Sequence, residues 1–162
     1  MEYDLGLINL IKDVLIENEK TLSIAESVTG GHLQALFSAA TDASKFFQGG
    51  ITVYNVGQKC RHLNVEPVHA QHNNCVSQKV SCQMAVEVNK LFLSNYGIGI
   101  TGYASRIPQQ GINEVFAFLA IAVGNKVVIT EKLRSNKKEG VEVQQDYCAQ
   151  IALIFKELLM TD

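Results

Sequence analysis

The turn from Ala25 to Gly31 carries the residue types best suited to chemistry in this sequence. It reads Ala-Glu-Ser-Val-Thr-Gly-Gly and separates a short apolar segment from a helix-like one. Glycines let the backbone approach a ligand closely, and the following helix offers unpaired N–H groups and a positive dipole end. Because Ser27 and Thr29 add hydroxyls at the same place, we expect a site for an anion or a developing oxyanion. The alternative is an ordinary turn with hydroxyl caps.

Two further reactive groups, Tyr54 and Lys59, follow the next predicted strand. In open α/β sheets ligands gather at the carboxyl ends of strands, so we expect both side chains to face the same mouth as Ser27. A lysine whose pKa is depressed by burial can serve as the general base for a serine, and a tyrosine hydroxyl can relay or donate a proton. The alternative for Lys59 is a solvated surface lysine, the commoner environment for this residue type.

The hydrophobic periodicity predicts the elements that must position these groups. Asn55 and Ser77 stand where helix N-caps are expected, Gly124-Asn125 is typical of a hairpin turn, and the paired glycines Gly49 and Gly50 suggest a bulge. Helices that alternate with strands and end in one hairpin indicate an α/β sandwich with a mixed sheet. We predict helices over 4–19, 32–40, 55–63, 77–92 and 141–159, and strands over 21–25, 46–54, 95–100, 115–123 and 127–133.

Composition limits the class of protein. The chain has 162 residues, which predicts one domain over 1–162, and its 47% apolar content is enough for a real core. With 14 Lys and Arg against 16 Asp and Glu, a protein held to nucleic acid by a basic surface is not expected. The chain has no apolar run of about 18 residues and begins with an acidic segment, so neither a membrane nor export is expected. We therefore expect a cytoplasmic protein whose four scattered cysteines are reduced thiols.

Four motifs together give a resemblance to a known family. They are the segment 26–31 (Glu-Ser-Val-Thr-Gly-Gly), the segment 50–55 (Gly-Ile-Thr-Val-Tyr-Asn) with Lys59, Val76-Ser77, and Ile100-Thr101-Gly102. The chain resembles the CinA C-terminal-domain family from about residue 5 to residue 155. That family contains the nicotinamide mononucleotide deamidases. The resemblance implies a three-layer α/β/α sandwich with a mixed, mostly parallel sheet, which commonly assembles into homo-oligomers.

The resemblance also implies a reaction and its residues. Ser27 matches the proposed nucleophile, Lys59 its basic partner, and Tyr54 the tyrosine that completes the cluster. The implied reaction is hydrolysis of the carboxamide of nicotinamide mononucleotide to the carboxylate, with release of ammonia. It needs no metal or organic cofactor, and the histidines His69 and His72 alone are too few ligands for a metal. The expected substrate-binding residues are Glu26, Thr29, Gly30, Gly31, Gly102 and Arg106.

The second half of the chain departs from the family pattern. Members read roughly G-I-A-G-P, whereas this chain reads Gly-Tyr-Ala-Ser-Arg over 102–106, followed by a shortened loop. The F-x-G-D-R element with its arginine is missing as well, which leaves Arg106, Arg134 or Lys137 to supply a charge. We expect a reshaped pocket that binds a nucleotide-like ligand through Arg106, with weakened deamidase activity. The alternative function is a catalytically weak or inactive nucleotide-binding or structural module.

Overall fold

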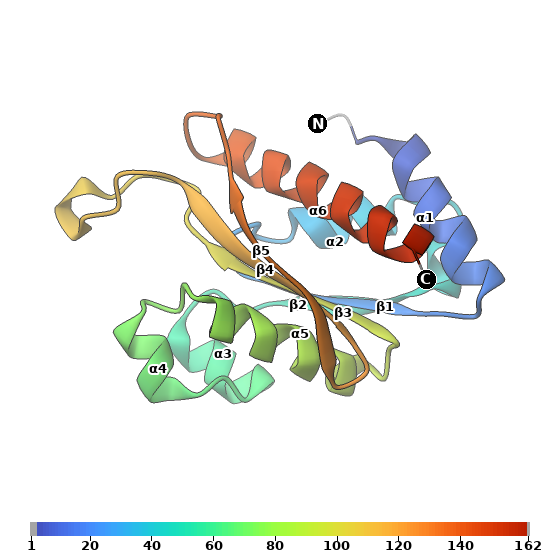
Figure 1. Cartoon of the computed structure of the whole chain (residues 1–162), viewed down its shortest axis with the longest axis horizontal. Coiled ribbons are helices and arrows are strands. Elements are labelled where there is room, and N and C mark those ends of the chain that lie inside the picture. The colour runs from blue at the N-terminus through green and yellow to red at the C-terminus, as the bar shows by residue number, and fades with distance from the viewer. Residues whose placement is uncertain (1–2, 162) are drawn as a thin grey trace.

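The computed structural model describes residues 3–161 and contains a five-stranded sheet (Figure 1). The strands are β1 (Leu22–Glu26), β2 (Phe47–Thr52), β3 (Tyr96–Gly102), β4 (Phe116–Val123) and β5 (Lys126–Arg134), in the order β2-β1-β3-β4-β5. Pairing is parallel from β2 through β1 to β3 and antiparallel from β3 through β4 to β5. The carboxyl ends of β1, β2 and β3 therefore meet at one edge of the sheet.

Helices cover both faces of the sheet, which confirms the expected three-layer α/β/α sandwich (Figure 1). The layer on one face holds α1 (Leu5–Glu17), α2 (His32–Ser38) and α6 (Val141–Thr161). The layer on the other face holds α3 (Val56–Leu63), α4 (Pro67–His72) and α5 (Gln78–Phe92). Within residues 3–161, no helix is both long enough and apolar enough to cross a membrane.

The predicted elements are present, with small shifts at their ends. Asn55 caps α3 by accepting from the N–H of Gln58, and Ser77 caps α5 by accepting from the N–H of Val80, as predicted. The expected bulge in β2 lies just before Gly49, where the pairing with β1 skips one residue. β2 ends at Thr52 and not at residue 54, because the chain turns there toward α3. The sequence analysis missed α4, which is only six residues long.

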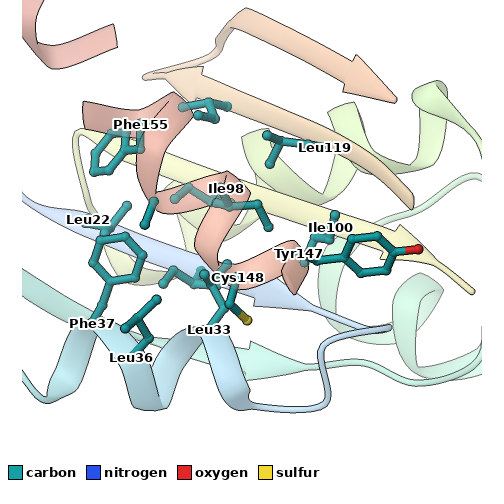
Figure 2. Packing of buried hydrophobic residues seen from close by; sticks show 14 of the residues in the cluster. Leu22, Leu33, Leu36, Phe37, Ile98, Ile100, Leu119, Tyr147, Cys148 and Phe155 are labelled. Carbon is teal, nitrogen blue, oxygen red and sulfur yellow. The ribbon is translucent and has the colours of Figure 1, made fainter. Parts of the chain in front are cut away.

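The main core lies between the sheet and the layer of α1, α2 and α6. Figure 2 shows Phe37 of α2 and Phe155 of α6 beside Leu22 of β1, and the two aromatic rings meet edge to face with centroids 6.1 Å apart. A second core joins α5 and α3 to the opposite face. All five residues of β1 are buried, as expected for a central strand covered on both faces.

Two glycines of β3 let α5 lie unusually close to the sheet. A Cβ built on Gly97 collides with the carbonyl oxygen of Ala85, and one on Gly99 lies 2.6 Å from the backbone nitrogen of the same residue. Backbone atoms of a helix cannot move aside as a flexible side chain would. The spacing between α5 and β3 therefore depends on the absence of side chains at these two positions.

We expect Gly99→Ala to lower the free energy of unfolding by about 3 kcal/mol, because the added methyl group overpacks the contact with α5. Gly57→Ala is the matched control, since a Cβ there meets only Asn55 Oδ1 at 3.5 Å and alanine is the better helix former by about 1 kcal/mol. Urea denaturation of both variants measures the difference. Equal stability of Gly99→Ala and the wild type would contradict this account of the packing.

Candidate active site

A cavity of about 390 Å³ opens at the carboxyl ends of β1, β2 and β3. It is lined by residues that follow each of the three strands, by the segment 74–76 between α4 and α5, and by Gln144 of α6. Its size is within the range typical of small-molecule sites, and its position is where ligands bind in open α/β sheets. The topology thus brings segments far apart in the sequence to one concave surface.

Ser27 and Lys59 are in direct contact in this cavity. Lys59 Nζ donates to Ser27 Oγ at 2.8 Å and to the carbonyl oxygen of Val53 at 3.0 Å. Both side chains are buried, with Lys59 only 1% exposed and Ser27 7% exposed. Lys59 lies one turn into α3, whose start is fixed by the Asn55 cap, so its side chain points back under the end of β2. The two groups therefore have the geometry of a nucleophile and its base.

Burial lowers the pKa of Lys59 below its ordinary value, because the ammonium loses its hydration inside the protein. The thiols of Cys75 and Cys60 act weakly in the opposite direction. Among the described residues that line the cavity, none is an aspartate or glutamate that would hold the lysine in its charged form. Lys59 is therefore poised to accept a proton and not only to provide a positive charge.

Glu26 does not line the cavity, in contrast to the expectation that it binds substrate. Its fully buried carboxylate accepts from the Thr29 hydroxyl at 2.6 Å and from the backbone N–H groups of Leu33 and Gln34 at 2.8 and 2.9 Å. A fourth hydrogen bond comes from the Gln34 side chain at 2.8 Å. Glu26 thus joins the end of β1 to the start of α2 and fixes the turn that carries Ser27.

The rest of the glycine turn does not line the cavity either. Thr29, Gly30 and Gly31 were expected to line the pocket, but of this turn only Ser27 and Val28 do so. Gly30 and Gly31 have φ values of 58° and 99°, so they allow the chain to reverse into α2. Their role in this structure is to shape the turn, and Thr29 supports it through its bond to Glu26.

Tyr54 and Gly102 both line the cavity, as the sequence analysis expected. Gly102 ends β3 beside the Ser27 turn. Tyr54 is 75% exposed, and no hydrogen bond joins its hydroxyl to any described residue. Because β2 ends two residues earlier, Tyr54 belongs to the loop at the mouth of the cavity and not to the buried pair.

The three cationic residues expected to supply a charge lie outside the cavity. Arg106 is exposed, and its Nη1 donates to the carbonyl oxygen of Lys138 at 2.6 Å. Arg134 ends β5, and Lys137 lies in the exposed segment before α6. The structure therefore does not place Arg106 in the cavity wall, and its guanidinium joins the loop after β3 to the segment before α6.

Several lining residues were given no role in the site by the sequence analysis, although Thr101 belongs to one of its four motifs. Thr101 follows the same rule as Ser27, since it lies at the carboxyl end of β3, and its hydroxyl donates to the carbonyl oxygen of Cys75 at 2.7 Å. Asn74 and Cys75 precede α5 in a segment without periodicity, so no signal marked them. Gln144 reaches the site from α6 and donates to the carbonyl oxygen of Val28 at 2.8 Å. Only the fold reveals such contacts.

A smaller hollow of about 150 Å³ lies among α1, α2 and α6. It is mostly apolar and contains Cys148, a thiol whose pKa is raised by burial and by the nearby Glu26 carboxylate. A thiol that resists ionisation is a poor nucleophile. The cavity at the strand ends is therefore the better candidate site.

We expect Glu26→Gln to lower the free energy of unfolding by about 2–3 kcal/mol. The amide NH2 of glutamine would replace one carboxylate oxygen, and it would face N–H and O–H donors without an acceptor. Glu17→Gln, at the exposed end of α1, is the control and changes stability by at most about 0.5 kcal/mol. Thermal unfolding of both variants provides the comparison. Equal effects of the two substitutions would contradict the anchoring role of Glu26.

Comparison with known proteins agrees with this architecture. A competence-damaged protein (CinA) superfamily protein from Klebsiella pneumoniae has the same fold, with a TM-score of 0.91 at 22% identity over 99% of this chain and 100% of that one. A second Klebsiella pneumoniae structure, described as competence damage-inducible protein A, gives a TM-score of 0.90 at 21% identity over 98% of each chain.

Relatives found by sequence similarity show which family the chain belongs to. A Mycoplasma genitalium protein is 31% identical over 83% of this chain and 87% of its own length. A CinA-like protein of Picosynechococcus is 41% identical over 59% of this chain, which corresponds to 23% of that protein, so the match spans about a quarter of this longer relative. The family model of the CinA C-terminal domain matches residues 5–159. The chain therefore belongs to the CinA C-terminal-domain family.

Proposed function

We propose that this protein is an amidohydrolase that removes the amide of a nicotinamide-type carboxamide, as in deamidation of nicotinamide mononucleotide. The observation that carries the proposal is the 2.8 Å contact between Lys59 Nζ and Ser27 Oγ, buried at the strand-end cavity. A surface lysine beside a serine would stay charged and hydrated. Here the lysine is desolvated and the serine lines a cavity large enough for a small substrate.

The first half of the proposed reaction makes an acyl-enzyme. Neutral Lys59 takes the proton of the Ser27 hydroxyl while Oγ attacks the carbonyl carbon of the amide. The tetrahedral intermediate collapses as Lys59 returns that proton to the nitrogen, and ammonia leaves. The ester formed on Ser27 retains the acyl part of the substrate.

The negative oxygen of the intermediate needs donors that are fixed in advance. The N–H of Val28 is the candidate donor, since Val28 directly follows Ser27 in the sequence and also lines the cavity. Within the described residues this N–H donates to no protein acceptor, and its peptide is held by the bond from the N–H of Gly30 to the carbonyl oxygen of Ser27 at 3.1 Å. We assign Val28 N–H to the oxyanion.

The second half of the reaction releases the acid. Water attacks the ester carbon, Lys59 takes one of its protons, and Ser27 Oγ leaves with that proton as the intermediate collapses. The products are the carboxylate and the regenerated serine. Tyr54 lies at the mouth of the cavity, where it can contact the substrate from the solvent side. We therefore assign it a role in substrate binding and not in proton transfer.

Replacement of the nucleophile tests the proposal directly. We expect Ser27→Ala to reduce ammonia release from nicotinamide mononucleotide by at least 10³-fold, with unfolding free energy changed by about 1 kcal/mol. Ser44→Ala, an exposed serine between α2 and β2, is the control and keeps wild-type activity. A wild-type protein that binds the mononucleotide but releases no ammonia would instead support the inactive binding module.

The pH profile tests the role of Lys59. Because the lysine works in its neutral form, kcat/KM rises with pH as Lys59 loses its proton. The lowered pKa places the midpoint of this rise below 10.5, the ordinary lysine value. Lys59→Arg is expected to be inactive at every pH, since a guanidinium does not deprotonate. A flat profile, or activity in Lys59→Arg, would remove Lys59 from the role of base.

A further inference from the structure

The walls of the strand-end cavity are nearly free of charge. The described residues that line it are apolar, hydroxyl, amide and thiol side chains, with Lys59 as the one cation. The Lys59 amine already contacts Ser27 and Val53, and it is desolvated. Arg106, the residue expected to bind a phosphate, is engaged with the Lys138 carbonyl oxygen outside the cavity. The strongest hydrogen bonds to a phosphate come from charged donors such as arginine, and apart from Lys59 no described lining residue supplies one.

Tyr103 forms a fixed aromatic part of the cavity wall. Its N–H donates to the carbonyl oxygen of Phe116 at 2.8 Å, and its own carbonyl oxygen accepts from the Tyr147 hydroxyl at 2.9 Å. The ring packs edge to face on Phe116 with centroids 5.4 Å apart. Contacts on the main chain and on the ring thus hold this tyrosine in one place.

Asn74 holds the outer end of the same ring. Its Nδ2 donates to the Tyr103 hydroxyl at 3.2 Å, and both residues line the cavity. This bond joins the segment before α5 to the loop after β3, so the wall is continuous between two separate parts of the chain. A rigid aromatic surface suits a flat aromatic ring, and the face of a tyrosine attracts the positive charge of an N-glycosylated nicotinamide ring.

We propose that the cavity recognises the flat pyridinium carboxamide of its substrate through the ring of Tyr103, and that it does not recognise a phosphate. This inference rests on the proposed function for the reaction, and it names the part of the substrate that is bound. The ring lies against Tyr103 with its amide toward Ser27. A ribose phosphate, where present, extends through the mouth into solvent.

Binding to an enzyme that does not turn over tests the inference separately from catalysis. Calorimetry on Ser27→Ala compares nicotinamide riboside with nicotinamide mononucleotide at fixed ionic strength. We expect dissociation constants within about threefold of each other, and no change in their ratio on Arg106→Ala. A tenfold or greater preference for the mononucleotide overturns the inference, as does failure of both ligands to bind. Binding without ammonia release by the wild type overturns only the proposed reaction.

The tyrosine is tested with two substitutions in the same background. Tyr103→Phe keeps the ring and removes the hydroxyl, so both ligands should bind within about threefold of the Ser27→Ala parent. Tyr103→Leu removes the ring and should weaken both ligands by at least tenfold, with thermal unfolding as the check that the variant is folded. Equal losses in the two variants would assign the effect to the Asn74 bridge and overturn ring recognition. Unchanged binding in Tyr103→Leu would overturn it as well.

Discussion

Glu26 ends β1 with a carboxylate buried from solvent, and four donors from Thr29, Leu33 and Gln34 surround it. A buried charge is costly unless it is fully hydrogen bonded, so this arrangement is satisfied only when β1, the turn and α2 are all in place. The carboxylate also occupies the positive end of α2, where a negative charge is favoured. The position of Ser27, the next residue, follows from this anchor.

Lys59 on the other side of Ser27 is also buried, yet its environment is different. It has one hydroxyl and one carbonyl oxygen as partners and no carboxylate in the cavity wall, so burial lowers its pKa. Glu26 is compensated by donors that do not change during a reaction, whereas the partner of Lys59 is a hydroxyl whose proton it can take. The same burial therefore produces a structural anchor at one residue and a base at the other.

Backbone placement explains what the sequence could predict. Ser27, Lys59, Tyr54 and Gly102 follow strand ends, and the rule that strand ends share one edge was enough to bring them to one cavity. Side-chain direction was not predictable in this way. Glu26 and Ser27 are adjacent in sequence, but Glu26 ends β1 and accepts from the N–H groups of α2, whereas Ser27 begins the turn and lines the cavity. The expected homo-oligomer stays a prediction.

Arg106 is a second residue whose side-chain direction could not be predicted from its position in the sequence. Ser105 and Ile107 line the cavity while the arginine between them points outward to Lys138. The N–H of Gly140 donates to the carbonyl oxygen of Ala104 at 2.7 Å, so two bonds tie this loop to the segment before α6. No sequence pattern reports such partners, because the loops are more than thirty residues apart.

The two segments that depart from the family pattern are in contact in the structure, because Arg106 of the loop after β3 donates to the carbonyl oxygen of Lys138 in the segment before α6. Arg106 binds the segment before α6, and Tyr147 of α6 holds the main chain of Tyr103. These two contacts hold the loop against α6 and the segment before it. The loop acts as a wall whose inner surface is set by Tyr103 and whose outer surface is set by Arg106. Tyr103 and Arg106 stand where the family pattern has an apolar residue and a proline. The tyrosine changes the surface of the cavity, and the arginine ties the same loop to the segment before α6.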